Sequence, residues 1–242
     1  MPGLGAPNRS GNRLLDALPE GERGRLTSAM RRVPLQPRQL LHRMGEALHT
    51  AYFPVSGLVS LVTRLTDGRT IEAAAVGNEG MVGVEAVLSG DQLPNTQAMA
   101  QVAGEALAIE AGALRAEVER NPWFRRLLLA YLQALLGQVS QAVACNGVHE
   151  VHQRAARWLL ETHDRVGRDT FELTHEFLAE MLGVTRPSVT IAARTLQAAG
   201  LIRYTRGTVT ILDRGGLEEA SCECYQAIRR IHDQVLGQLR EE

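Results

Sequence analysis

Residues 173–212 hold the side chains of this sequence that are best suited to chemistry with duplex DNA. Thr174 and Thr185 can each cap a helix, and Gly183 permits the left-handed backbone that ends the first helix. The second predicted helix has an inward apolar face. Its other face carries Arg186, Ser188, Thr190 and Arg194. A short helix that begins with arginine and carries no acid suits the major groove, so the segment predicts a helix-turn-helix.

The polar residues of this segment divide into two predicted groups of DNA contacts. Arg186 and Ser188 are expected to read base edges, and Thr190 and Arg194 to contact bases or phosphates. A two-stranded wing should follow the second helix. The residues expected to hold the DNA backbone from the first helix and the wing are Thr174, Arg203, Thr205 and Arg206.

The charge of the predicted DNA-binding segment is local. Between Glu180 and Asp213 there are four arginines and no acidic residue, although the whole chain has a formal charge of −1. A local basic patch on a neutral protein can still attract and hold phosphate. The alternative is a solvated helical hairpin with ordinary surface arginines. The coincidence of two caps, a turn glycine and an acid-free face favours DNA binding.

The cysteines offer a second possible chemistry. The chain has three, Cys145, Cys222 and Cys224, and an odd, sparse set argues against a disulfide framework. Cys222 and Cys224 with His232 nearby could suggest a metal or redox site. Zinc usually requires four well-spaced ligands, which the sequence does not assemble. We expect structural thiols beside a C-terminal helix, with no metal, no cofactor and no catalytic residues.

Length and composition limit the class of protein. At 242 residues with 45% hydrophobic content, the chain can hold two domains with real cores. All 26 basic residues are arginine. No apolar run reaches the length of a membrane span, and the N-terminus lacks the pattern of a signal peptide. We expect a cytoplasmic protein that does not associate with membranes.

The first half of the chain predicts a β-rich domain over residues 1–120. Asp67-Gly68 lies between two strand-like runs and is a strong hairpin signal. Many short strands at regular spacing favour a barrel or jelly roll. The apolar runs expected as strands are residues 33–35, 39–41, 51–53, 58–65, 70–76, 97–102 and 106–109.

A long helix is predicted over residues 121–148, beginning at Asn121-Pro122. Some of its apolar residues alternate in steps of four and three, which is a heptad pattern typical of a parallel dimer. The expected seam consists of Leu128, Leu132, Leu135, Val139, Ala142 and Asn146. Leu127, Tyr131 and Leu136 are expected to pack on the chain's own barrel. Paired chains would read half-sites roughly 34 Å apart.

Residues 149–242 should form the DNA-binding domain. An amphipathic helix over residues 151–163 leads into the helix-turn-helix and its wing. A terminal helix is expected from Leu217 to Leu239, with an apolar stripe that includes Cys224. The fold class is therefore α+β, with a β jelly roll, a dimerisation helix and a winged helix-turn-helix.

This order of elements resembles the Crp/Fnr family of bacterial transcription regulators. The most specific motifs are residues 178–189 (LAEMLGVTRPSV), residues 199–202 (AGLI) and residues 52–57 (YFPVSG). In that family, the recognition helix begins with an arginine that contacts guanine, followed by an acid and a serine or threonine. Arg186 and Ser188 match, whereas Pro187 replaces the acid. The resemblance implies a homodimer that binds double-stranded DNA, with RNA polymerase as a further partner.

The resemblance also implies a sensor domain, but its cyclic-nucleotide residues are missing. The family's Gly-Glu pair corresponds to Gly83-Val84, and its phosphate-binding arginine corresponds to Gln97. A cyclic phosphate would then lack its charge-assisted hydrogen bonds. We predict that this chain does not bind cyclic AMP in the usual way, and the sequence does not identify its effector. No cysteine precedes Cys145, so the family's N-terminal iron–sulfur cluster is not expected.

Two other function classes remain open alternatives. His42 and His49, with Glu46 between them, could serve a cupin-type metal enzyme or hold haem, although no second ligand cluster follows them. The third possibility is an architectural protein that binds DNA without sequence preference and with strong salt dependence. The leading prediction remains a sequence-specific transcription regulator rather than an enzyme.

Overall fold

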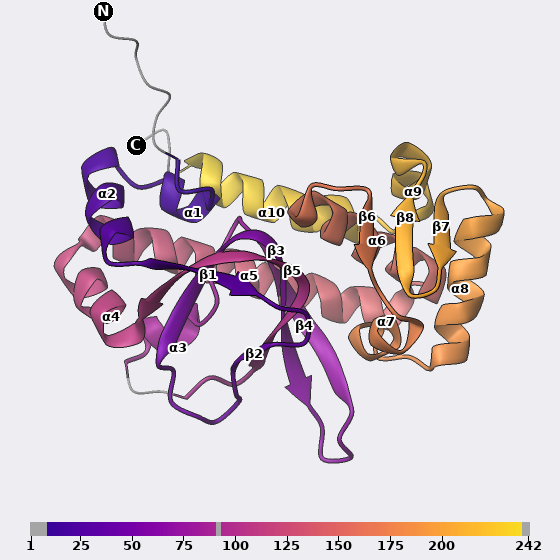
Figure 1. Ribbon diagram of the computed structural model, residues 1–242, viewed down its shortest axis with the longest axis horizontal. Helices are drawn as coiled ribbons and strands as arrows, with labels where there is room; N and C mark the ends of the chain where they lie inside the picture. The colour runs from indigo at the N-terminus through magenta and orange to yellow at the C-terminus, as the bar shows by residue number, and fades with distance from the viewer. Residues whose placement is uncertain (1–8, 91–92, 239–242) are drawn as a thin grey trace, which may run out of the picture.

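The computed structural model describes residues 9–90 and 93–238, which form two lobes joined by long helices (Figure 1). The N-terminal lobe comprises α1 (Arg13–Asp16), α2 (Glu20–Ser28), β1 (Arg31–Leu35), β2 (Leu40–His42), β3 (Thr50–Arg64), β4 (Thr70–Val76), α3 (Val84–Leu88), β5 (Gln97–Glu110) and α4 (Ala111–Arg120). The long α5 (Pro122–Val148) follows. The C-terminal lobe comprises α6 (Val151–Val166), β6 (Thr170–Glu172), α7 (His175–Leu182), α8 (Arg186–Ala198), β7 (Ile202–Thr205), β8 (Thr208–Ile211), α9 (Arg214–Ala220) and α10 (Cys224–Gln238).

The N-terminal lobe is built on one antiparallel sheet with the order β1-β5-β3-β4, in which β2 also pairs with β5. Four of the runs predicted as separate strands merge in pairs into the long β3 and β5. The two strands stay paired across bulges near Gly57, where an added Cβ would lie 2.6 Å from the Val102 carbonyl oxygen. Glycine therefore allows each long strand to bend without breaking. The predicted hairpin at Asp67-Gly68 is confirmed between β3 and β4.

The long helix α5 begins as its sequence indicates, because the Asn121 side chain accepts a hydrogen bond from the Phe124 N–H and Pro122 occupies the first turn. It packs against β4 and runs beside α10. Among the described residues it is the one helix whose length and composition would also suit a membrane span. The expectation that no apolar run reaches the length of a membrane span is thus corrected for α5. The apolar residues that α5 buries pack against the sheet and α10.

The C-terminal lobe contains a small three-stranded sheet with the order β6-β8-β7, whose strands share one core with α6, α7 and α8. The terminal helix predicted from residue 217 onward is instead two helices, since α9 ends at Ala220 and α10 begins at Cys224. The Ser221 hydroxyl donates to the Glu218 carbonyl oxygen, and Ser221 itself has an extended backbone that ends α9. Leu239, the last residue of the predicted stripe, lies outside the described residues. The break brings Cys222 and Cys224 to the end of α5.

The two lobes share a hydrophobic core. Barrel residues Leu58, Val62 and Val102 pack in one cluster with Trp158 of α6 and Phe177 of α7. The turn after α7 also touches the barrel, because a Cβ at Gly183 would lie 3.4 Å from the Ile71 side chain. The sheet therefore contacts the first helix of the helix-turn-helix directly, while α8 lies at the far edge of the molecule (Figure 1).

Candidate nucleic-acid interface

The helix-turn-helix forms through the caps that its sequence indicates. The Thr174 hydroxyl accepts a hydrogen bond from the Phe177 N–H at 3.2 Å, and the Thr185 hydroxyl accepts one from the Ser188 N–H at 3.4 Å. Gly183 has a φ of 63° and ends α7 in the left-handed conformation. Val189, together with Ala192, Ala193 and Leu196, turns the apolar face of α8 inward. These local features fix which side of α8 faces solvent.

The solvent-facing side of α8 carries cationic and hydroxyl groups. Arg186 and Arg194 are exposed, and Ser188 and Thr190 are half-buried. The Arg186 guanidinium forms an exposed ion pair with Glu176 at 2.9 Å, so DNA would have to compete with that carboxylate. An exposed ion pair of this kind contributes little to protein stability. A phosphate or a guanine can therefore take the place of the Glu176 carboxylate beside Arg186.

Thr190 joins the two helices of the motif. Its hydroxyl donates to the Arg186 carbonyl oxygen at 3.0 Å and also lies 3.0 Å from His175 Nδ1. Burial lowers the pKa of His175 below its usual value, and the positive charges of Arg186 and Arg194 lower it further. The contact between His175 and Thr190 therefore joins α7 to α8. Thr190 is the predicted contact residue whose hydroxyl is most engaged within the protein.

The wing brings the remaining arginines to the same end of the lobe. Arg206 and Gly207 both have positive φ, of 48° and 80°, and they form the two-residue loop between β7 and β8. This geometry is that of a type I′ hairpin turn, which holds Arg206 at the tip. Arg203, Thr205 and Thr174 are also exposed, as expected for contacts with a DNA backbone.

One exposed residue of α8 was not among the DNA contacts predicted from the sequence. Ile191 is 66% exposed although it is large and apolar, and it lies between Thr190 and Arg194 on the recognition helix. An exposed apolar side chain in such a place can contact the methyl group of thymine. The signal was present, because Ile191 falls outside the inward spacing of Val189 and Leu196.

The exposed face of α5 corrects the predicted dimer seam. Leu128 and Leu135 belong to the chain's own core, while Leu136, expected to pack inward, is 65% exposed. Leu129 and Val143, each seven residues from Leu136, are 49% and 69% exposed. Leu132, Val139 and Ala142 are half-buried, and Asn146 is exposed. The apolar outer face of α5 therefore runs through Leu129, Leu136 and Val143 instead of Leu128 and Leu135.

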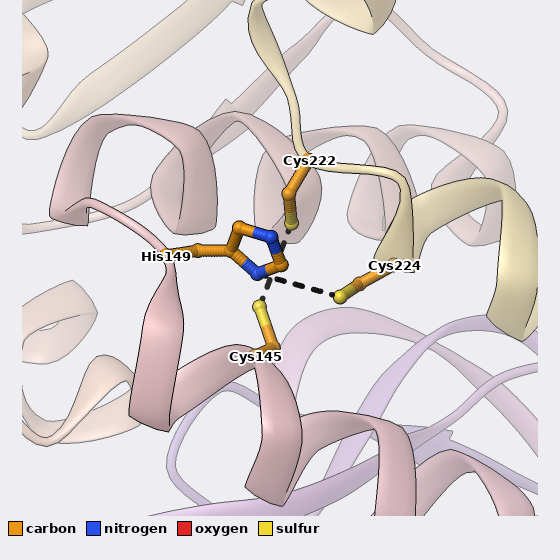
Figure 2. A group of neighbouring side chains, drawn as sticks. All are labelled: Cys145, His149, Cys222 and Cys224. Atoms are coloured by element: carbon orange, nitrogen blue, oxygen red, sulfur yellow. Dashed lines mark hydrogen bonds between the residues drawn. The ribbon is translucent and has the colours of Figure 1, made fainter.

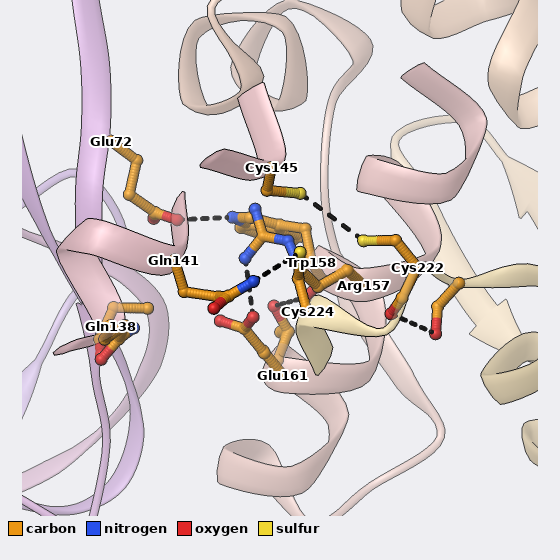
Figure 3. Close-up of polar contacts among 12 residues, drawn as sticks. Glu72, Gln138, Gln141, Cys145, Arg157, Trp158, Glu161, Cys222 and Cys224 are labelled. Carbon is orange, nitrogen blue, oxygen red and sulfur yellow. Dashed lines mark hydrogen bonds and ion pairs between the residues drawn. The ribbon is translucent and has the colours of Figure 1, made fainter. Parts of the chain in front are cut away.

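A buried polar network joins α6 to the barrel (Figure 3). The Trp158 indole N–H donates to Glu72 Oε1 at 3.1 Å, and Ser60 donates to the other oxygen of Glu72. Arg165 donates to Glu79 at 2.9 Å. Burial raises the pKa of the Glu72 carboxyl to about 7 against the opposing hydrogen bond from Ser60. The contact between the lobes thus contains a carboxyl that titrates near neutral pH.

The thiols form a cluster that the sequence did not assemble. Cys145, His149, Cys222 and Cys224 offer ligand atoms that all lie within 4.8 Å of one another (Figure 2). The cysteines are buried, and the His149 side chain is 15% exposed. A hydrogen bond from Cys222 lowers the pKa of the Cys145 thiol, with a further contribution from the positive charge of Arg157.

His232, the histidine considered with the cysteines as an alternative to structural thiols, lies elsewhere: its Nε2 contacts the Gln138 side chain at 3.0 Å. The histidine beside the thiols is His149, which lies four residues after Cys145 at the end of α5. That spacing places both side chains on one helical face and could have been recognised. The proximity of Cys222 and Cys224 could not, because it depends on the break between α9 and α10.

The histidines proposed for an enzyme or haem site do not converge. His42 is buried, and its Nε2 lies 3.1 Å from the Thr96 carbonyl oxygen, whereas His49 and Glu46 are exposed. Burial lowers the pKa of His42. Within residues 9–90 and 93–238, these three are not among the side chains grouped as possible metal ligands.

Comparison with known proteins matches each lobe to a protein-family model. The model of the cyclic nucleotide-binding domain matches residues 32–121, and the model of the Crp-like helix-turn-helix domain matches residues 153–220. The chain belongs to the Crp/Fnr family. The predicted α+β architecture and the winged helix-turn-helix are therefore confirmed.

Individual relatives of this Crp/Fnr protein are transcription regulators. A CRP-like cAMP-activated global transcriptional regulator of Mycobacterium tuberculosis is 26% identical over 196 residues, which cover 78% of this chain and 87% of the relative. The transcriptional regulator SdrP of Thermus thermophilus is 26% identical over 175 residues, or 70% and 82% of the two chains. A solved CRP-family regulator from Thermus thermophilus superposes with a TM-score of 0.65 at 25% identity, covering 78% of this chain and 96% of that one.

The two positions that the sequence comparison aligned with cyclic-nucleotide contacts, Val84 and Gln97, lie at the starts of a helix and a strand. Val84 is fully buried at the start of α3, and Gln97 is half-buried at the start of β5. Neither side chain carries a positive charge. Glu85 follows Val84, and one of its carboxylate oxygens is buried without a hydrogen-bond partner among the described residues. Burial raises the pKa of Glu85, which weakens the case for a fixed negative charge here.

Proposed function

We propose that the protein is a homodimeric, sequence-specific transcription regulator of the cytoplasm and not an enzyme. The observation that carries this proposal is the exposed, acid-free surface made by α8 and the wing. Arg186 and Ser188 would read base edges, and Thr190 and Arg194 would contact bases or phosphates. Thr174, Arg203, Thr205 and Arg206 would hold the DNA backbone. We include RNA polymerase among the partners because the relatives are transcription regulators.

The dimer is proposed through the outer face of α5. Leu129, Leu136 and Val143 repeat every seven residues, and Leu132, Val139 and Asn146 lie at the intermediate heptad positions. Alternation of these two sets is the pattern by which two parallel helices pack. A second copy of the chain fits this face, because the same apolar stripe would meet itself across a twofold axis. Asn146 would pair with its counterpart and fix the register.

The barrel of this protein is proposed not to bind cyclic AMP in the usual manner, in contrast to the activation named for the Mycobacterium tuberculosis relative. Val84 and Gln97 leave a cyclic phosphate without a cationic partner. Isothermal titration of the purified dimer with cyclic AMP is expected to give no binding heat at ligand concentrations up to about 1 mM. Any dissociation constant would then lie above about 1 mM, which is a very weak affinity. Micromolar affinity would contradict the proposal.

Sequence-specific binding is tested by fluorescence anisotropy with promoter fragments from the source genome and with scrambled duplexes. The wild-type protein should prefer some fragments, and Arg186→Ala should lower that preference by about 1–3 kcal/mol. Arg64→Ala, which removes an exposed arginine of the barrel, is the matched control and should leave selectivity unchanged. Equal affinity for all duplexes, with a steep salt dependence, would instead support the architectural alternative.

A further inference from the structure

We propose that Cys145, His149, Cys222 and Cys224 form a structural zinc site that joins the end of α5 to the beginning of α10. Cys145 lies in the last turn of α5 and His149 caps that helix. Cys222 lies in the short link after α9, and Cys224 is the first residue of α10. This inference is independent of the proposed function in DNA binding.

Two of the distances between ligand atoms match the edges of a zinc tetrahedron, and all of them are within 4.8 Å. Zinc bonds of about 2.3 Å to sulfur and about 2.0–2.1 Å to nitrogen imply edges of roughly 3.8 Å between sulfurs and roughly 3.6 Å between sulfur and nitrogen. Cys145 Sγ lies 3.5 Å from Cys222 Sγ, and Cys224 Sγ lies 3.6 Å from His149 Nδ1 (Figure 2). Three thiols and one imidazole are also a usual ligand set for structural zinc.

The surrounding groups orient the histidine and one thiol. His149 Nε2 lies 3.1 Å from Glu223 Oε2, so the Nε2–H can donate a hydrogen bond to the carboxylate and leave the Nδ1 lone pair free for a metal. Such a carboxylate behind a histidine ligand is common in zinc sites. Gln141 Nε2 donates to Cys224 Sγ at 3.0 Å, a contact that favours a thiolate.

Nearby arginines compensate the charge that the ligands would carry. Three thiolates and one zinc ion have a net charge of about −1. Arg154 and Arg157 are buried, and both have an Nε atom without a hydrogen-bond partner among the described residues. Arg157 interacts electrostatically with Cys145, and Arg154 with both Cys145 and Cys222. Arg157 also forms a buried ion pair with Glu161 at 2.7 Å, so its charge is shared with that carboxylate, and together with Arg154 it lowers the cost of burying thiolates.

Four protein ligands close the coordination sphere, so the site leaves no position for a substrate and stabilises structure instead of performing catalysis. It connects Cys145 to Cys222 across 77 positions of the sequence. Zinc binding would hold the junction of α5 and α6 against α10, so that the C-terminal lobe keeps its position on the long helix. A disulfide between Cys145 and Cys222 would use only two of these four converging ligands.

The first test measures metal in the full-length protein purified under reducing conditions without chelators. Inductively coupled plasma mass spectrometry should find one zinc per chain. Cys145→Ser should lower zinc content at least tenfold, whereas His152→Gln, a histidine substitution three residues beyond His149, should retain it. Zinc-free wild-type protein that also fails to bind added Zn²⁺, or full zinc content in Cys145→Ser, would overturn the proposal.

The second test uses wild-type protein only, so it does not depend on the folding of a variant. After zinc removal by chelation and dialysis, titration with Co²⁺ should produce one equivalent of the visible bands and thiolate charge-transfer absorption of tetrahedral cobalt. Chelation should also lower the melting temperature, and added Zn²⁺ should restore it. Stoichiometric iron with labile sulfide, or a Cys145–Cys222 disulfide under reducing conditions, would refute the zinc assignment.

Discussion

The helices α8 and α5 each leave one face uncovered, and the two faces differ in chemistry. The face of α8 presents Arg186 and Arg194 with hydroxyl groups between them. The face of α5 presents Leu136 with apolar neighbours one heptad away on either side. Water solvates the first face well and the second poorly. The first is therefore suited to a polyanion, and the second to another apolar helix.

The two faces also differ in how a partner would be selected. Charged and hydroxyl groups on α8 can select a partner by hydrogen bonding, whereas an apolar heptad face selects one by shape and register. Because α6 follows α5 directly and packs against α8, pairing through α5 would set the spacing of two α8 helices. Each face can be disabled separately, and doing so tests the division of roles.

The largest effect is expected from Leu136→Glu. Burying this carboxylate and losing two leucines at the proposed dimer contact should cost about 3 kcal/mol or more, which raises the dimer dissociation constant at least about a hundredfold. Analytical ultracentrifugation measures that constant. The control Leu65→Glu changes a leucine that is also exposed but lies in the β3–β4 hairpin, and it should remain dimeric. A Leu136→Glu protein that stays a dimer would place the interface elsewhere.

The buried polar network between α6 and the barrel is tested by Glu72→Gln. The pKa of Glu72 is raised from 4.5 to about 7, so its contribution to stability is complete below about pH 4.5 and is lost as the pH rises through 7. Glutamine resembles the protonated form and still accepts from Trp158. Urea unfolding should show a variant equal to wild type near pH 5 and more stable near pH 8, by on the order of 1–2 kcal/mol. If the difference in stability between the variant and wild type were the same at pH 5 and pH 8, the raised pKa of Glu72 would be contradicted.

A smaller effect is expected from Arg206→Ala at the tip of the wing. Since this arginine is proposed to contact phosphate and not bases, affinity should fall by a similar factor of about 3–10 for every duplex. The slope of log affinity against log salt should decrease by about 0.9 per lost phosphate contact. Anisotropy titrations at several salt concentrations measure both quantities. Loss of preference among sequences would instead assign Arg206 a role in base reading.

The smallest effect is expected from Ile191→Ala, about 1 kcal/mol or less, because only a few methylene groups lose a contact. The loss should appear on thymine-containing sites. On the same duplex with uracil in place of thymine, wild type and variant should bind almost equally, since uracil lacks the methyl group. A difference that persists on the uracil duplex would mean that Ile191 supports the helix and does not read a base.

The orientation of α8 could be predicted from the sequence, whereas that of α5 could not. In α8 the buried residues Val189 and Leu196 fit one helical periodicity, and Ile191 is the single large apolar residue outside it. In α5 consecutive leucines, such as Leu127 to Leu129, surround the helix, and several heptad registers fit equally well. Only packing against the sheet and α10 decides which register is buried. Leu128 and Leu135 of the predicted seam are therefore buried in the chain's own core, and dimerisation through α5 stays a prediction.

Long-range proximity marks the other limit of the sequence. The β3–β4 hairpin was predictable because Asp67 and Gly68 specify a local turn. The thiol cluster was not, since Cys145 and Cys222 come together only through the packing of α10 on α5. The merging of predicted strands into β3 and β5 has a similar cause, because pairing continues across glycine-containing bulges that read as loops in a single sequence.

Selection of binding sites from a random duplex library by the full-length protein tests whether paired chains present two α8 surfaces to adjacent turns of DNA. The enriched sequences should contain two inverted half-sites with centres about 10 base pairs, or one helical turn of roughly 34 Å, apart. Enrichment of single half-sites, or no enrichment at low salt, would contradict this arrangement.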